Sequence, residues 1–202
     1  GVKKWQDLRK IQVIGANSGK TNSGYMNPKL MSVLLGLKMR FVTGYKGSSR
    51  SILAIEQGEA QMSSFNWLTW DSKVPHWFKG KRPFARAILQ NGVDKDPALP
   101  HIPMLADLVT DSEKPLVAFI ASMGPIGRGV TMPPGVPKHL IKALRTAYDK
   151  MNADPAFEAE LKKRRLRLIA SSGEKIQSIV NKALKASSPA VIKEVRKLIF
   201  GK

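Results

Sequence analysis

The chain has 202 residues, of which 43% are hydrophobic, and it carries 34 basic and 15 acidic side chains, a formal net charge of +19. This length and hydrophobic content are enough for one large domain or two small ones with a real core. No apolar run reaches about eighteen residues, which excludes a membrane-spanning helix, and the absence of cysteine excludes disulfides and thiolate chemistry.

The first part of the chain predicts strands that alternate with helices, which is typical of a parallel α/β sheet. The expected strands are residues 11–14, 38–45, 60–65 and 83–90. The expected helices are residues 5–9, 28–35 with Asn27 as the N-cap, 50–56 capped by Ser48 or Ser49, 68–79 and 104–110. Residues 117–122 are apolar and fit either a helix end or a strand.

From about residue 135 helices dominate. A break is expected at residues 124–129, strands at 130–137 and 166–170, and helices at 138–151, 155–165, 174–184 and 189–200, with Ser172 capping the third of these. This part has too few strands for a self-sufficient α/β domain. We therefore expect it to belong to a lobe whose remaining strands lie upstream or in a partner.

The stretch at residues 11–24 is the most typical of a binding function. An apolar run predicts a buried strand, glycine and small polar residues follow from 15 to 24, and a helix comes next. This order gathers free backbone N–H groups at a helix N-terminus, where they favour an anion. The glycine spacing fits neither a Walker loop nor a dinucleotide-binding loop. An ordinary turn between strand and helix is the alternative.

Two further segments are expected beside this loop, because ligands bind at the carboxyl ends of parallel strands. They are residues 45–49, after the second strand, and Asn66 with Trp67, after the third. The aromatic side chains of residues 68–79 fit an apolar core better than a binding site.

Nothing in the sequence indicates catalysis. His76, His101 and His139 stand in separate contexts without metal-ligand spacing, and no nucleophile-elbow motif is present. No pair of carboxylates is embedded in apolar sequence that would shift a pKa. We therefore expect neither a catalytic residue, nor a metal site, nor a cofactor, and predict a binding protein rather than an enzyme.

The net charge raises a second class of function, a basic nucleic-acid-associated protein. The basic residues are spread along the chain, with the densest runs at residues 79–86 and 162–167. No zinc-finger, RNA-recognition or basic-zipper pattern accompanies them. We regard nucleic acid as the less favoured partner and keep it as the alternative.

Several segments together resemble the solute-binding receptors of tripartite tricarboxylate transporters, and the resemblance extends over nearly the whole chain. These segments are residues 35–38, 42–48 (VTGYKGS), 53–60 (LAIEQGEA), 96–103 (DPALPHIP), 132–137 (MPPGVP) and 153–157 (ADPAF).

The resemblance implies an α/β fold of the periplasmic binding protein type II class, a Venus flytrap with a parallel-rich sheet flanked by helices. Residues 1–124 would form the second, ligand-binding lobe. Residues 125–202 would form the mainly helical C-terminal portion of the first lobe. The family's first lobe begins with a segment that holds the other carboxylate loop and has no counterpart here, so we expect the N-terminal part of this lobe to be absent from the chain.

The resemblance also implies an extracytoplasmic receptor in the periplasm, with its signal peptide removed, that delivers a small organic carboxylate to an integral membrane permease. The expected ligand loop consists of Asn17, Ser18, Gly19, Thr21, Asn22 and Ser23. The wall that sets ligand identity is expected to contain Tyr45, Lys46, Asn66 and Trp67.

Overall fold

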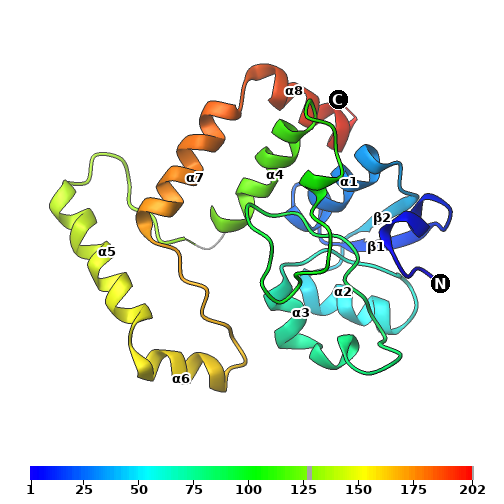
Figure 1. Ribbon diagram of the computed structural model, residues 1–202, viewed down its shortest axis with the longest axis horizontal. Helices are drawn as coiled ribbons and strands as arrows, with labels where there is room; N and C mark the ends of the chain where they lie inside the picture. The colour runs from blue at the N-terminus through cyan, green and yellow to red at the C-terminus, as the bar shows by residue number, and fades with distance from the viewer. Residues whose placement is uncertain (127–128, 202) are drawn as a thin grey trace.

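The computed structural model describes residues 1–126 and 129–201. Its helices and strands, in chain order, are η1 (Trp5–Arg9), β1 (Val13–Asn17), α1 (Ser23–Leu35), β2 (Met39–Thr43), α2 (Gly47–Glu56), α3 (Trp67–Lys73), η2 (Pro75–Phe78), η3 (Leu105–Asp107), α4 (Lys114–Ile126), α5 (Lys138–Asn152), α6 (Pro155–Lys163), α7 (Gly173–Ala186) and α8 (Pro189–Phe200). Figure 1 shows them as a body, formed by the elements up to α4 together with α7 and α8, and an arm formed by α5 and α6.

A small parallel sheet lies at the centre of the body. β1 and β2 pair in parallel, from Val13 opposite Met39 to Asn17 opposite Thr43. On the other side of β1 the chain forms a single parallel bridge between Gly15 and Met62. β1 is therefore the middle element of the sheet: α1 connects it to β2, and α2 connects β2 to the segment that contains Met62.

The two faces of the sheet are covered by different helices. On one face α1 lies between the sheet and the pair α4 and α8, and the shared core contains Val13, Leu30, Ile120 and Ile199. On the other face α2 packs closely, because Ala16, Ala54 and Ala60 are small and fully buried. The last helix of the chain therefore contributes to the same core as the first strand.

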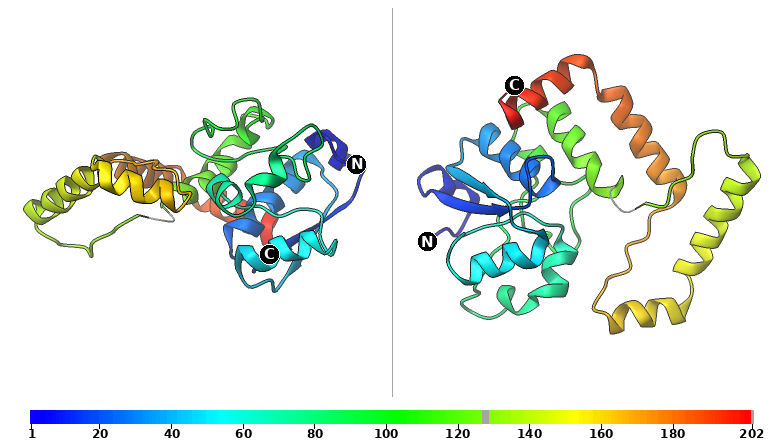
Figure 2. Two further views of the ribbon diagram at one scale, coloured as in Figure 1. Left: turned by 90° about the horizontal axis from the view of Figure 1, so that it is seen from below. Right: turned by 180° about the vertical axis from the view of Figure 1, so that it is seen from behind.

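The arm has little contact with the body. Figures 1 and 2 show α5 and α6 standing apart from it, and no described residue of either helix is buried. Arg145 of α5 pairs with Glu174 of α7 at 2.7 Å. Leu140, Leu144 and Met151 form an apolar stripe on α5 that faces solvent. The arm is thus a single layer of amphipathic helix, whereas a stable domain packs at least two layers.

The α/β class and several elements are confirmed. α8 has the expected bounds, α5 ends one residue later than expected, and Ser172 caps α7 by accepting a hydrogen bond from the Lys175 N–H. The helix after the first strand ends, as expected, at Gly36, whose φ of 64° suits glycine. The expected division at residue 124 stays a prediction. α7 packs on α4, and α8 packs on α4 and α1.

Three expectations near the glycine-rich loop are wrong. The first strand starts and ends later than expected and contains Gly15, Ala16 and Asn17, because these small residues fit between α2 and the neighbouring strand. α1 begins at Ser23, capped by Asn22, and Pro28 is buried inside the helix instead of starting it. α2 begins at Gly47, so neither Ser48 nor Ser49 is its cap.

Four expected strands have no ladder in the described residues. Residues 60–65 run beside β1, but the Ser63 hydroxyl donates to the Ala16 carbonyl at 2.8 Å, where a continuing strand would donate a backbone N–H. Residues 83–90 form one bridge, between Gln90 and Met104. Residues 130–137 and 166–170 belong to no strand in the described chain, and Pro134 and Gly135 within the first of these segments form a turn.

The apolar segment at residues 117–122 belongs to α4, which continues to Ile126. The expected break at 124–129 therefore begins later than predicted, and Gly127 and Arg128 lie outside the described residues. Among the helices described, none combines the length and the apolar character needed to cross a bilayer.

Candidate functional site

The candidate site lies where β1 and β2 end. Beyond the strands, the Tyr45 N–H donates to the Asn17 carbonyl at 3.2 Å and the Gly44 N–H to the Ser18 carbonyl at 3.3 Å. From this point the chain turns to α1 on one face of the sheet and to α2 on the other. The carboxyl edge of an α/β sheet is the usual position for a ligand.

The N-terminus of α1 points into this edge. Asn22 caps the helix, since its side-chain oxygen accepts a hydrogen bond from the Gly24 N–H at 2.8 Å. In the described ranges no protein acceptor binds the N–H groups of Gly19, Lys20, Thr21 or Ser23. These free donors, together with the helix dipole, favour a negatively charged group.

The segment after the Met62 bridge lies against this loop. A Cβ atom on Gly24 would lie 2.9 Å from the Ser64 carbonyl oxygen, so only glycine permits this approach. The hydroxyl of Ser63 donates to the Ala16 carbonyl. The sequence analysis expected residues 15–24, 45–49 and Asn66 with Trp67 to lie together. The contacts described here join the first two segments at Asn17 and Tyr45, and bring residues 63–64, just before Asn66, against the loop.

Most of the expected wall residues have side chains that already contact other residues of the protein. The Tyr45 hydroxyl donates to Glu59 at 3.1 Å, and desolvation together with this carboxylate raises the pKa of Tyr45. The Asn66 side chain caps α3 by accepting from the Thr69 N–H at 2.9 Å. The Trp67 ring packs edge-on against Phe78, with ring centroids 4.8 Å apart. The Lys46 side chain is exposed and forms no cap.

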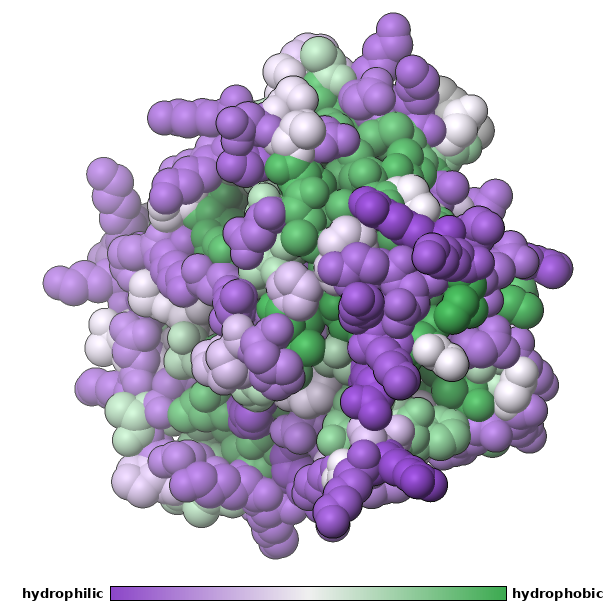
Figure 3. Space-filling model, turned by 45° about the vertical axis from the view of Figure 1, so that its right-hand side comes forward, coloured by the Kyte–Doolittle hydropathy of each residue, from purple (hydrophilic) through white to green (hydrophobic). Residues whose placement is uncertain are grey.

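Exposed ammonium groups surround the edge. Lys20 follows β1 and Lys46 precedes α2, and the Lys73 ammonium of α3 donates to Ser49 at 2.6 Å. Figure 3 shows hydrophilic side chains projecting over much of one face of the molecule, with apolar patches between them. Cations at this edge would steer an anion toward the free N–H groups.

Asn17 belongs to the strand and not to the loop. Its side chain is 3% exposed, and its amide nitrogen donates to the Gly15 carbonyl at 3.0 Å. The side-chain oxygen is buried and has no partner in the described part of the chain. A buried acceptor of this kind calls for a donor from water or from a ligand.

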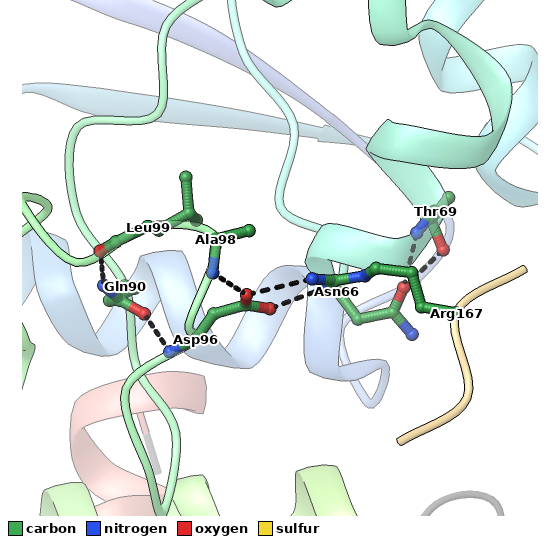
Figure 4. A network of polar contacts seen from close by, with 7 residues as sticks. All are labelled: Asn66, Thr69, Gln90, Asp96, Ala98, Leu99 and Arg167. Carbon is green, nitrogen blue, oxygen red and sulfur yellow. Dashed lines mark hydrogen bonds and ion pairs between the residues drawn. The ribbon is translucent and has the colours of Figure 1, made fainter.

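The sequence analysis missed a polar network that lies beside the site. Figure 4 shows the Arg167 guanidinium reaching the Asp96 carboxylate, with its two terminal nitrogens 3.3 and 3.0 Å from the two carboxylate oxygens. The Ala98 N–H donates to Asp96 at 2.9 Å, and the Asp96 N–H donates to Gln90 at 3.0 Å. Burial tends to raise the pKa of Asp96, but the bonds from Arg167 and Ala98 outweigh it and hold this pKa below its usual value.

Arg167 and Asp96 are 71 positions apart in the sequence. The sequence signal for the pair was the run of basic residues at 162–167, which the sequence favours as a solvated helix end.

Two open clefts are lined neither by the residues of the loop between β1 and α1 nor by Asp96 or Arg167. One has a volume of about 450 Å³, lies between α5 and α7, and is lined by Arg145, Glu174 and other polar residues of α7. The other, of about 340 Å³, lies between the N-terminal residues 3–6 and residues 87–88 and 101–103. In the described chain no group of three or more His, Asp or Glu side chains is arranged to hold a metal ion.

The fold is similar to that of a known structure, Rpa4515 of R. palustris with adipate. The two chains are 17% identical with a TM-score of 0.59, and the match covers 98% of this chain and 61% of that chain. The present chain thus spans less than two thirds of the length of that protein, and at this identity the likeness shows the fold alone. No protein-family model and no curated protein matches the sequence.

Proposed function

We propose that the chain is the ligand-binding part of an extracytoplasmic receptor for a small organic carboxylate. The observation that carries the proposal is the set of N–H groups without a protein acceptor in the loop between β1 and α1, at Gly19, Lys20, Thr21 and Ser23. The similar R. palustris protein was solved with adipate, a dicarboxylate, which supports the same class of ligand.

In this proposal a carboxylate accepts hydrogen bonds from the N–H groups of Gly19, Thr21 and Ser23 and from the hydroxyl of Ser18. Each hydrogen bond to a charged group contributes about 1.5–3 kcal/mol. Asn22 acts through the backbone by capping α1, and Asn17 offers a buried acceptor below the loop.

The wall of the proposed site acts mainly through its backbone. The hydroxyl of Tyr45 is bonded to Glu59 and the ring of Trp67 packs on Phe78, so in this proposal these two side chains shape the wall and do not bind the ligand directly. Lys46 supplies positive charge, and the side-chain nitrogen of Asn66 remains available to a ligand. Residues 1–124 would form this lobe, residues 125–202 would belong to the other lobe, and the loaded form would be recognised by a membrane permease from the periplasmic side.

The experiment that tests the proposal is a titration of the ¹⁵N-labelled protein with adipate, observed through its backbone amide resonances. We expect saturable shifts at residues 18–24 and 44–47 and none in α5. Adipamide, which has the same chain length without charge, is the matched ligand control. Shifts that are equal for adipate and adipamide, or that are confined to other parts of the chain, would contradict the proposal.

A pair of variants separates side-chain from backbone contributions. Ser18→Ala removes one hydroxyl donor and is expected to weaken adipate binding about tenfold, since 1.4 kcal/mol corresponds to one factor of ten. Ser178→Ala, at an exposed position of α7, is the control and should leave binding unchanged.

Nucleic acid is the competing ligand. Duplex DNA that binds with a steep salt dependence, while adipate produces no shift, would favour the alternative function.

A further inference from the structure

The apolar stripe on α5 is left uncovered by the described chain. Its members Leu140, Leu144 and Met151 are 46%, 36% and 41% exposed, and no described residue of α5 or α6 is buried. The segments that lead into and out of the arm add further exposed apolar side chains, those of Val130, Met132 and Ile169. An apolar helix face that is exposed from one end to the other indicates a surface that meets a partner.

α5 lies where a partner can reach it. Figures 1 and 2 show this helix at the outer edge of the molecule, apart from the body. Arg145 pairs with Glu174 of α7 at 2.7 Å, and the neighbouring Leu144 points about 100° away from Arg145 around the helix axis. The exposed stripe and the side of α5 that contacts α7 are therefore different faces.

The rest of the α5 surface is basic. The helix contains Lys138, Lys142, Arg145 and Lys150 and one acidic side chain, Asp149. With about 3.6 residues per turn, all five lie outside the arc that holds the apolar side chains. An apolar stripe opposite a lysine-rich face is the pattern of a helix that lies in the interface of a membrane.

A lipid bilayer matches both faces of this helix better than the other partners that its charge or its stripe would attract. Nucleic acid would pair with the cations and leave the stripe in water. A second copy of α5 would cover the stripe but bring together two helices that each carry a net positive charge. An anionic bilayer offers negative headgroups to the lysines and an apolar boundary to the stripe, and the net charge of +19 favours its approach.

We propose that α5 docks the protein on the surface of an anionic lipid bilayer. The stripe enters the boundary between headgroups and acyl chains, and the lysines stay among the phosphates. With 15 residues α5 is shorter than the roughly 20 residues needed to cross a bilayer, so it lies in the plane of the interface. The proposal does not depend on the ligand of the loop before α1, and its failure would leave the proposed function unaffected.

The test measures binding of the full chain to lipid vesicles by flotation. We expect binding to vesicles of equimolar phosphatidylcholine and phosphatidylglycerol that weakens as salt rises, and little binding to phosphatidylcholine alone. Leu144→Gln should weaken binding about tenfold, because the stripe loses an apolar side chain. Val33→Gln is the matched control, at a position of α1 that is 39% exposed, and should change nothing.

Two further variants test the charge and guard against misfolding. Lys142→Gln should weaken binding to the mixed vesicles about fivefold, whereas Lys197→Gln, at an exposed position of α8, should not. Because Leu144 is exposed, Leu144→Gln should unfold at the same temperature as the wild type. If it does not fold, Leu140→Gln tests the same stripe.

A fluorescent label identifies the face that meets the lipid. The chain contains no cysteine, so one introduced cysteine can carry a nitrobenzoxadiazole group at a single position. Leu144→Cys places the label on the stripe, and Thr146→Cys places it about 200° further around the helix, on the polar face. With mixed vesicles, emission should rise at residue 144 and stay unchanged at residue 146.

Three results would overturn the proposal. The first is no binding to the mixed vesicles at low salt, or equal binding by wild type and Leu144→Gln. The second is emission at residue 144 that rises with protein concentration and does not change when vesicles are added, which would show that a second copy covers the stripe. The third is binding of duplex DNA, weakened by Lys142→Gln and not by Leu144→Gln, without binding to vesicles.

Discussion

Replacing Gly24 with alanine tests how closely α1 approaches the segment beside β1. Glycine in a helix is less stable than alanine by roughly 0.5–1 kcal/mol, so helix propensity alone predicts a gain. At this position, however, the new Cβ would lie 2.9 Å from the Ser64 carbonyl oxygen and 3.2 Å from the Asn22 side-chain oxygen. The first contact involves backbone, so α1 or residues 63–66 must move.

The size of the effect follows from these opposing contributions. Inserting a group into a packed region costs about 1–3 kcal/mol, which exceeds the gain in propensity. We therefore expect the free energy of unfolding to fall by about 1–2 kcal/mol, or about 2–8 °C in Tm for a chain of this length. The movement also displaces the free N–H groups at the start of α1, so carboxylate binding should weaken in the same variant.

Gly124→Ala is the control, measured by thermal unfolding and by urea titration. Gly124 lies within α4, and a Cβ atom there would meet nothing within 4 Å. The same substitution should therefore stabilise the protein, by up to about 1 kcal/mol. If Gly24→Ala is as stabilising as Gly124→Ala, the close approach of α1 to Ser64 is refuted.

Three further outcomes follow from the structure. The pKa of Asp96 is lowered in the folded state, so its contribution to stability is present above the unfolded pKa and is lost as pH falls through the folded pKa. The urea midpoint of Asp96→Asn should therefore depend less on pH, below about pH 4, than the midpoint of the wild type. Asn22→Ala removes the cap of α1 and should cost about 1 kcal/mol, whereas Asn22→Ser should restore most of it. Ile199→Ala, at a position 1% exposed, should cost about 2–5 kcal/mol, and Leu184→Ala, at a position 70% exposed, less than about 0.5 kcal/mol by chemical denaturation.

Helices with local start and stop signals were predictable from sequence. α8 has Ser188 as its cap and Pro189 in its first turn, and the Ser188 hydroxyl oxygen accepts a hydrogen bond from the Val191 N–H at 3.2 Å. α7 follows Ser172 in the same manner. Such signals act between residues three or four positions apart, so no tertiary information is needed to find them.

Strands were less predictable, because a strand exists only when another strand pairs with it. Residues 130–137 and 166–170 have sequences that predict strands, yet no ladder forms there in the described residues. In the segment after α2, one serine hydroxyl is enough to reduce a strand to a bridge. These effects depend on what lies alongside the segment, and a single sequence does not contain that information.

The proposed site depends on backbone N–H groups more than on side chains, and this limits which of its features residue patterns can predict. A shift in the first strand places Asn17 inside the sheet, so a residue expected to contact ligand becomes a buried acceptor below the loop. The free N–H groups of Gly19, Thr21 and Ser23 are unaffected by that error, because they follow from the order of strand, loop and helix. The class of ligand can therefore be proposed from the order of elements, while the side-chain contacts that would choose among carboxylates depend on the tertiary structure.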